Sequence, residues 1–248
     1  MLKKNKLIHI VYLAVIFVLV AVIVVFAVNL YQKSGGALTD HQKYYQSKCE
    51  SYKVQNTNLS KGQIVFVGDS ITDLYPLDDY YADLDLAVYN RGIGGDTTTG
   101  VLNRLKESVF DLKPSKVVLM IGTNDINGWV KTDKILQNYR EILTRIQAEL
   151  PTTKIYCISI IPQNLTLESY SLIKVNKTTP RILEINKQIK SIVSSKQNIT
   201  YLDLFPLLAD ENNMLIEKYS DDGIHLNAEG FKVWTGLLKP YLVLPNSL

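Results

Sequence analysis

Cysteine and histidine are both scarce in this sequence of 248 residues, which has two cysteines and three histidines. Two cysteines are too few for a disulfide scaffold or a cysteine metal site. Because Cys157 lies in the apolar run 155–161, which is typical of a buried strand, we expect it and Cys49 to be structural. The sequence also has no His/Asp/Glu cluster at metal-ligand spacing and no complete nucleotide-binding glycine loop. No metal or cofactor is therefore expected.

Basic runs interleaved with aromatic residues are absent after Lys33. The formal net charge of +3 comes from the three lysines that precede residue 7, because residues 7–248 hold 24 basic and 24 acidic side chains. A balanced chain lacks the positive field that binding to a phosphate backbone requires. Nucleic acid is therefore not an expected partner.

One long hydrophobic run lies near the N-terminus, where Ile10 to Val28 are 19 consecutive residues without a charged side chain. As a helix with a rise of about 1.5 Å per residue, this run is about 28 Å long, which matches the apolar core of a bilayer. Three lysines precede the run and one, Lys33, closely follows it. The positive-inside rule therefore predicts a single-pass cell-membrane anchor with a cytoplasmic N-terminus and an extracytoplasmic body.

The alternative to an anchor is a cleaved signal peptide, because residues 25–27 loosely fit a cleavage site, although the apolar run is longer than usual for one. Residues 32–60 show no sustained apolar period, so we expect them to form a stalk. A short helix over residues 39–54 is an alternative for part of this segment. We therefore divide the chain into a cytoplasmic tip and anchor at 1–31, this stalk, and one folded domain at 61–248.

Short runs rich in β-branched residues alternate with longer amphipathic segments through the folded domain. The predicted strands are Gln63 to Val67, Leu86 to Tyr89, Lys116 to Ile121, Lys154 to Ile160 and Asn198 to Leu202. The predicted helices are Thr97 to Phe110, Thr132 to Leu150, Pro180 to Ser195 and Ala228 to Leu238. This alternation is typical of an α/β fold in which helices flank a parallel sheet.

Four short polar motifs lie where such a fold binds ligands, beyond the carboxyl ends of the strands. Residues 68–72 (Gly-Asp-Ser-Ile-Thr) follow the first strand, 90–96 the second and 122–125 (Gly-Thr-Asn-Asp) the third, while 222–225 (Asp-Gly-Ile-His) precede the last helix. Each motif alone is weak evidence, because Gly-Asp-Ser also suits a turn and Gly-Thr-Asn-Asp a helix cap. Their joint occurrence in these positions predicts a functional site.

The folded domain contains one histidine, His225, because the other two precede residue 42. A serine hydroxyl is a poor nucleophile unless a base takes its proton, and histidine is the usual base. If Ser70 has a histidine base, that base is His225. Asp222 lies three residues before His225, a spacing that can bring its carboxylate to the imidazole and fix the tautomer.

Acyl transfer also needs hydrogen-bond donors directed at the oxygen that becomes negative, each worth about 3 kcal/mol. The predicted strand ends supply three candidates, namely the backbone N–H groups of Ser70 and Gly95 and the side-chain amide of Asn124. We expect Asp69 and Asp125 to shape loops through local hydrogen bonds and not to take part in the chemistry.

The four motifs resemble the sequence blocks of the SGNH hydrolases, also called the GDSL lipase/esterase family, over about residues 62–240. The stretch Asn90 to Thr97 is especially similar to the catalytic subunits of platelet-activating-factor acetylhydrolase and to the bacterial acylhydrolases that resemble them. Ile71 departs from the leucine that is common in the first block, which is a conservative change.

The resemblance implies a flavodoxin-like, three-layer α/β/α fold with a five-stranded parallel sheet and a carboxylic ester hydrolase without a cofactor. It also implies that Ser70 is the nucleophile, that Asp222 and His225 complete the triad, and that Gly95 and Asn124 complete the oxyanion hole with the Ser70 N–H.

The substrate is less well indicated than the chemistry. Because an outward-facing tethered domain would meet cell-surface glycans, we expect short-acyl (acetyl) esters of extracytoplasmic carbohydrate as substrates. The alternatives are a lysophospholipase or other lipid esterase, an O-acyltransferase acting on cell-surface glycan, and a catalytically silent surface-binding module. For Arg91 and Trp129 the sequence does not decide between a structural role and a role in contacting the substrate.

Overall fold

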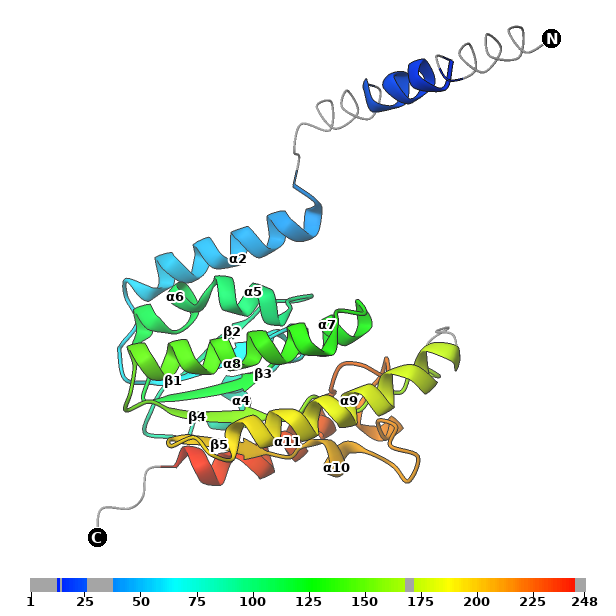
Figure 1. Ribbon diagram of the computed structural model, residues 1–248. Coiled ribbons are helices and arrows are strands. Elements are labelled where there is room, and N and C mark those ends of the chain that lie inside the picture. Colours follow the sequence, from blue (N-terminus) through cyan, green and yellow to red (C-terminus); the bar gives the residue numbers. More distant parts are fainter. Residues whose placement is uncertain (1–12, 14, 26–37, 168–171, 244–248) are drawn as a thin grey trace, which may run out of the picture. The chain divides into compact units, whose positions relative to one another are not determined.

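The computed structural model describes residue 13 and residues 15–25, 38–167 and 172–243 (Figure 1). The chain forms two compact units, residues 1–43 and 44–248. In the first unit, residues 13 and 15–25 are helical, and the two ends of the expected anchor lie outside the described residues. Among the residues that are described, no helix has both the length and the apolar character needed to cross a membrane.

A five-stranded parallel sheet forms the centre of the second unit. Its strands are β1 (Ile64–Gly68), β2 (Val88–Gly92), β3 (Lys116–Met120), β4 (Lys154–Ile158) and β5 (Ile199–Leu202). All neighbours pair in parallel, in the order β2-β1-β3-β4-β5. The expected α/β fold with five parallel strands is therefore confirmed. The chain turns to opposite sides of β1 to form β2 and β3, and this change of direction opens a crevice where ligands bind in such sheets.

Apart from the lysines that begin β3 and β4, the central strands consist almost wholly of apolar residues because both faces of the sheet are covered. Val65 and Val67 of β1 point into one hydrophobic cluster, and Ile64 and Phe66 point into the other. The first cluster takes in α5, α8 and α9, and the second takes in α4, α10 and α11. The helices are α2 (Asp40–Asn56), α3 (Ser70–Asp73), α4 (Leu77–Tyr81), α5 (Thr98–Asn103), α6 (Leu105–Ser108), α7 (Thr123–Asn127), α8 (Thr132–Glu149), α9 (Leu172–Val193), α10 (Phe205–Leu208) and α11 (Ala228–Leu242), with 3-10 turns at Phe110–Leu112 and Glu217–Tyr219.

The predicted helices of the folded domain lie near their expected positions, with two differences. The segment expected as a single helix from Thr97 to Phe110 is broken at Arg104, which has non-helical backbone angles (φ −112°, ψ 17°) and separates α5 from α6. The Arg104 side chain is fully buried. Helix α9 begins at residue 172, before the expected start at Pro180, which lies inside it.

Helix α2 occupies much of the predicted stalk, 32–60, in agreement with the alternative of a short helix at 39–54. From Tyr44 onward it belongs to the same compact unit as the sheet, and Cys49, Tyr52 and Asn56 are buried. Cys49 and Tyr52 pack against Ile93, in the loop after β2. The boundary of the folded body therefore lies earlier than residue 61. Tyrosine and cysteine supply the buried face of α2, so the sequence shows no aliphatic period there.

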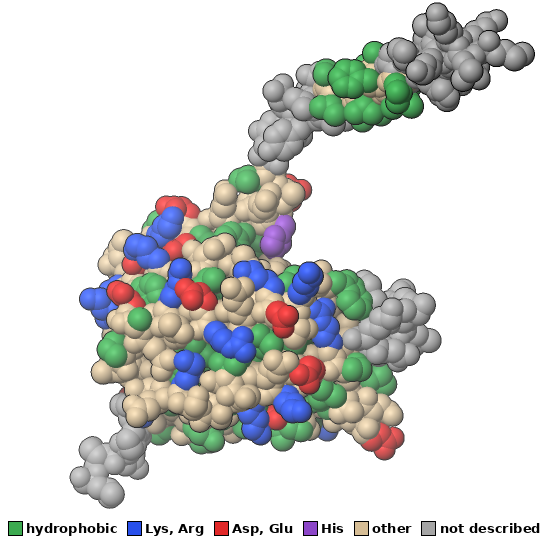
Figure 2. All heavy atoms as spheres, in the orientation of Figure 1, with side chains coloured by type: hydrophobic (Ala, Val, Ile, Leu, Met, Phe, Trp, Pro, Cys, Tyr) green, Lys and Arg blue, Asp and Glu red, His purple; other side chains and the backbone are tan. Residues whose placement is uncertain are grey.

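The face of the molecule drawn in Figure 2 carries charges of both signs. Figure 2 shows Lys and Arg side chains interspersed with Asp and Glu over this face. The mixture agrees with the equal numbers of basic and acidic residues beyond residue 6.

The packing of α8 against the sheet gives a direct test of the fold. Ile142 is fully buried in the first cluster, so Ile142→Ala should lower the free energy of unfolding by about 2–5 kcal/mol through lost burial and the cavity left behind. Thr144→Ala, at an exposed position of the same helix, should change it by less than about 0.5 kcal/mol. Urea denaturation of both variants measures the difference, and equal losses would contradict this packing.

Candidate active site

Ser70 is placed by a sharp turn from β1 into the short helix α3. Gly68 ends the strand, and a Cβ there would collide with the carbonyl oxygen of Met120 and the side chain of Thr72, so glycine is needed at this turn. Asp69 caps the helix by accepting a hydrogen bond from the Ile71 N–H at 3.0 Å. Ser70 is thus the first residue of α3, at the carboxyl end of a central strand.

Asp222, His225 and Ser70 form one continuous hydrogen-bonded chain. The Nδ1 atom of His225 lies 2.5 Å from Oδ2 of Asp222, and its Nε2 atom lies 2.8 Å from Oγ of Ser70. With the Nδ1 proton directed at the carboxylate, Nε2 accepts from the serine hydroxyl, which is the arrangement that a general base requires. The structure therefore brings together all three residues of the predicted triad, and their catalytic roles stay a prediction.

The loop that carries Asp222 and His225 is held by backbone hydrogen bonds. The other carboxylate oxygen of Asp222, Oδ1, accepts from the N–H groups of Ile224 and His225, each at 2.8 Å. Gly223 has φ 80°, and a Cβ on it would collide with the carbonyl of Asn164, so this turn also needs glycine. The side chains of His225 and Asp222 are 33% and 32% exposed, which leaves the site accessible to a substrate.

The electrostatics of Asp222 suit a carboxylate that stays ionised. Partial burial raises the pKa of its carboxyl, but the hydrogen bonds from the His225 ring and from the His225 and Ile224 N–H groups outweigh this and lower the pKa below its usual value. A negative Asp222 stabilises the positive imidazolium that forms when His225 takes a proton.

The candidate oxyanion donors come from three different segments, namely helix α3, the loop after β2 and helix α7. Gly95, at φ 75°, lies in a turn closed by a 3.1 Å hydrogen bond from the Asp96 N–H to the Ile93 carbonyl. Within the described part of the chain, the backbone N–H groups of Ser70 and Gly95 make no hydrogen bond. The Asn124 amide donates to the Asp96 carbonyl at 2.9 Å, which uses one of its two hydrogens and leaves the other. Their oxyanion roles stay a prediction.

A buried arginine connects these segments, and sequence reasoning missed it. Arg104, 0% exposed, donates from Nε to Oδ2 of Asp96 at 2.7 Å. Its Nη2 atom donates to the carbonyl of Gly68 at 2.9 Å, and its Nη1 atom donates to the carbonyl of Arg91 and to Oγ of Ser108. Arg104 thereby ties the ends of β1 and β2 to the loop that carries Gly95. The only signal in the sequence was an arginine within a predicted amphipathic helix.

Asp125 makes a long-range contact in place of the expected local one. Its carboxylate accepts from the Thr98 N–H at 2.9 Å and from the Thr98 hydroxyl at 2.7 Å. This joins α7, which carries Asn124, to the first turn of α5. Burial raises the pKa of the Asp125 carboxyl, against the lowering effect of the Thr98 hydrogen bonds.

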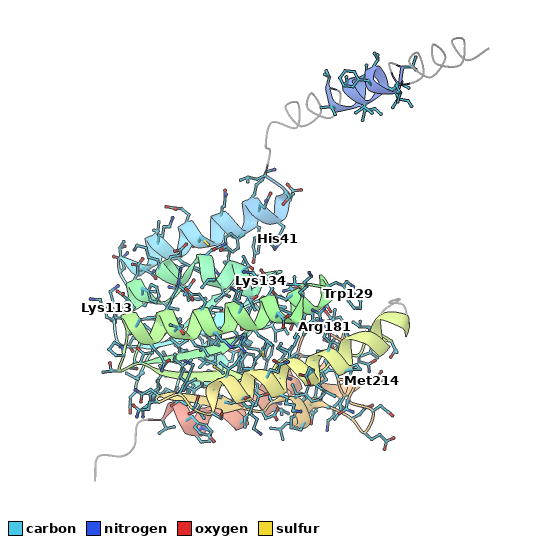
Figure 3. The ribbon with its side chains drawn as sticks, viewed as in Figure 1. His41, Lys113, Trp129, Lys134, Arg181 and Met214 are labelled. Carbon is cyan, nitrogen blue, oxygen red and sulfur yellow. The ribbon has the colours of Figure 1, made fainter. Side chains whose placement is uncertain are left out.

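Arg91 and Trp129, whose roles the sequence does not decide, differ in their surroundings. Arg91 is buried, stacks over the Tyr52 ring at 4.5 Å and donates to the Asn56 side chain at 3.0 Å, so it packs inside the body. Trp129 is 51% exposed after α7, at φ 57°. Figure 3 shows it near Arg181 of α9, whose guanidinium lies 5.9 Å from the ring centre.

The described residues offer no site for a metal, because no three His, Cys, Asp or Glu side chains among them are grouped to hold one. Cys49 and Cys157 are buried free thiols. A hollow of about 450 Å³ between α9 and α10 contains none of the triad residues. The triad itself lies at the carboxyl ends of the strands, where the chemistry is expected.

Asp69 gives the site a pH-dependent contribution to stability. It is 1% exposed, and its Oδ2 atom has no hydrogen-bond partner among the described residues. Burial raises the pKa of this carboxyl to about 7, even though the Ile71 hydrogen bond lowers it. The folded protein therefore keeps a proton on Asp69 that the unfolded chain loses near pH 4, as expected for a free aspartate at about 3.9. Stability from this group falls as the pH rises between these two values.

Replacing Asp69 by Asn should remove this dependence, because the amide keeps the cap but does not titrate. The unfolding free energy of the wild type minus that of Asp69→Asn should fall between pH 5 and pH 7, by at most about 1.4 kcal/mol per pH unit. Urea denaturation at both pH values measures it, with Asp133→Asn, an exposed change on α8, as the matched control. A difference that stays constant or grows with pH would show that Asp69 is ionised in the fold.

Known proteins are similar to this chain in both sequence and fold. The model of the GDSL-like lipase/acylhydrolase family matches residues 66–233. The platelet-activating factor acetylhydrolase IB alpha2 subunits of Rattus norvegicus and Homo sapiens are each 26% identical over 171 residues, or 68% of this chain and 70% of theirs. A solved structure from Streptococcus pneumoniae, named for platelet-activating factor, has a TM-score of 0.75 and 28% identity, over 88% of this chain and 99% of that one.

An acetylxylan esterase from Geobacillus stearothermophilus shares the fold, with a TM-score of 0.58 and 19% identity over 75% of this chain and 96% of that one. The family match spans more than half of the chain and includes every predicted site residue from Ser70 to His225. The protein therefore belongs to the GDSL-like lipase/acylhydrolase (SGNH) family and is a carboxylic ester hydrolase.

Proposed function

We propose that this protein removes short acyl groups, acetyl above all, from extracytoplasmic carbohydrate, using Ser70, His225 and Asp222 as its catalytic triad. The observation that carries the proposal is the continuous chain from Asp222 through His225 to Ser70, with contacts of 2.5 and 2.8 Å. A partly exposed serine in hydrogen-bond contact with an oriented imidazole is the arrangement for nucleophilic acyl transfer.

The chemistry follows from the two ends of the imidazole. Oγ of Ser70 attacks the ester carbonyl while its proton passes to Nε2 of His225, and Asp222 stabilises the resulting imidazolium. The tetrahedral intermediate collapses as His225 returns the proton to the leaving alcohol, which leaves an acyl-serine. Water, activated by the same histidine, then attacks the acyl-serine and releases the acid.

The developing negative charge has its own set of donors. The N–H groups of Ser70 and Gly95 and the free hydrogen of the Asn124 amide are the proposed oxyanion hole. Because the first two make no hydrogen bond within the described part of the chain, they can donate to an oxyanion without first breaking another contact. Preorganised donors of this kind stabilise the transition state more than water does.

Two lines of support favour a short acyl group on an extracytoplasmic substrate. The relatives at 26% identity are named acetylhydrolases, which favours acetyl esters. The run Ile10 to Val28 supports a transmembrane signal anchor that holds the catalytic domain outside the cytoplasm. In the described part of this run the helix is apolar all round, with side chains such as Leu13 and Phe17 exposed, and a helix of that kind is stable in apolar surroundings.

The triad is tested by Ser70→Ala in p-nitrophenyl ester hydrolysis, with acyl chains from acetate to palmitate. Without its nucleophile the enzyme should lose about 10⁴-fold or more in kcat, while circular dichroism and thermal unfolding stay unchanged. Ser191→Ala, at an exposed position of α9, is the matched control and should keep full activity. Full activity in Ser70→Ala would refute the mechanism.

The acyl series and acetylated glycans together test the substrate. Wild-type activity should be greatest with acetate and fall with chain length, and acetate should be released from acetylated polysaccharide. A long-chain preference would favour a lipid esterase, and acetyl transfer to an added sugar would favour an acyltransferase. Absence of any Ser70-dependent turnover would favour a binding module.

The anchor is tested in cells that express the full chain with a C-terminal tag. The tagged protein should stay in the membrane pellet after alkaline carbonate extraction and should be digested by protease added to intact spheroplasts. A shortened protein in the medium would favour signal cleavage near residues 25–27. A full-length protein in the cytoplasmic supernatant would contradict the anchor.

A further inference from the structure

We propose that Asp73 is a positioning residue that fixes the loop after β2, and with it Gly95, by clamping this loop to helices α2 and α3. The inference rests on the proposed function, because Gly95 matters for turnover only as an oxyanion donor. Asp73 lies outside the four sequence motifs, at the last position of the helix that begins with Ser70.

Three donors from two segments converge on the Asp73 carboxylate. Oδ2 accepts from the Tyr44 hydroxyl at 2.6 Å and from the Gly94 N–H at 3.2 Å. Oδ1 accepts from the Lys48 ammonium group at 2.7 Å. The side chains of Asp73 and Lys48 are 21% and 28% exposed, so this ion pair is partly shielded from water.

The clamp acts next to the proposed oxyanion donor. Gly94 immediately precedes Gly95, so a bond to the Gly94 N–H restricts the peptide plane that leads into Gly95. Asp73 also donates its own N–H to the carbonyl of Asp69 at 2.9 Å, within the turn of α3 that presents Ser70. One short helix therefore holds the nucleophile at its start and the clamp at its end.

The remainder of the loop is fixed from other directions. Arg104 holds the carboxylate of Asp96, and the Asn124 amide holds its carbonyl. At the start of the loop, Gly92 lies so close to the backbone of Asp73 that a Cβ would collide with it. The Asp73 carboxylate therefore secures the segment between these two fixed points, which contains Gly94 and Gly95.

A carboxylate suits this position because the Lys48 ammonium group and the Gly94 N–H can only donate, and the Tyr44 hydroxyl donates to Oδ2 here. An asparagine would offer one acceptor oxygen and place its NH₂ group against a group that can only donate, either the Lys48 ammonium group or the Gly94 N–H. It would also remove the negative charge that faces Lys48. Asp73→Asn is close in size to the native residue and tests the bonding without creating a cavity.

The experiment compares Asp73→Asn and Lys48→Met with Lys48→Arg and with Lys53→Met, an exposed change on α2. Asp73→Asn should lower kcat for p-nitrophenyl acetate by about 10-fold to 100-fold, since a displaced donor costs part of what a deleted one costs, with KM within about twofold. The pH dependence of kcat/KM should be unchanged, because Ser70, His225 and Asp222 are intact. Lys48→Met should lose less, Lys48→Arg should retain activity, and Lys53→Met should match the wild type.

Amide hydrogen exchange supplies a readout that does not depend on turnover. In Asp73→Asn, exchange across residues 92–97 should be at least several-fold faster, while β1 keeps its protection. Unchanged exchange in this loop, or a kcat loss no larger than the loss of folded protein, would overturn the inference. A wild type without Ser70-dependent activity would refute the proposed function, and the exchange result would still decide whether Asp73 holds the loop.

Discussion

The arrangement of the site depends on one buried charge, the guanidinium of Arg104. A fully buried cation is tolerated only when it is paired and its donors are satisfied. Arg104 is paired with one carboxylate, and that carboxylate, one hydroxyl and two backbone carbonyls accept from four of its five N–H donors. The two carbonyls belong to Gly68, the last residue of β1, and to Arg91, the second-to-last residue of β2. Because of this, a change in the relative position of these strands or of Asp96 would leave buried guanidinium donors without acceptors. The cost of such a change keeps the loops in one arrangement.

Asp96 also connects the Arg104 network to helix α7, on the other side of the site. Its carbonyl accepts from Asn124, and the neighbouring Asp125 accepts twice from Thr98 in the same loop region. The proposed nucleophile and oxyanion donors therefore lie on separate strand ends, but side-chain-to-backbone hydrogen bonds join these ends together. Such bonds fix distance and direction at once, which hydrophobic packing alone does not do. Preorganisation of this kind is what acyl transfer needs.

The sequence predicts the strands and helices that follow a simple hydrophobic pattern, and it predicts the site residues that belong to a rare residue type. The strands follow from β-branched runs, and the partners of Ser70 follow from the presence of one histidine beyond residue 41. The break at Arg104 and the burial of that residue could not be predicted, because a long charged side chain in an amphipathic helix usually faces water. The contact between Asp73 and Tyr44 could not be predicted for a related reason, since their hydrogen bond joins residues 29 positions apart. Local patterns carry no information about such pairs.

Helix α2 also contacts the edge strand of the sheet. Strand β2 forms one edge of the sheet, and exposed edges of this kind can pair with other chains and aggregate. The Tyr52 hydroxyl donates to the carbonyl of Gly92 at the end of this strand, and the Arg91 side chain of the same strand is bound by Asn56. A fragment that began at residue 61 would lack both contacts and would expose buried apolar surface around Ile93. The folded body of this enzyme therefore includes helix α2 from Tyr44 onward as well as the segment that carries the four motifs.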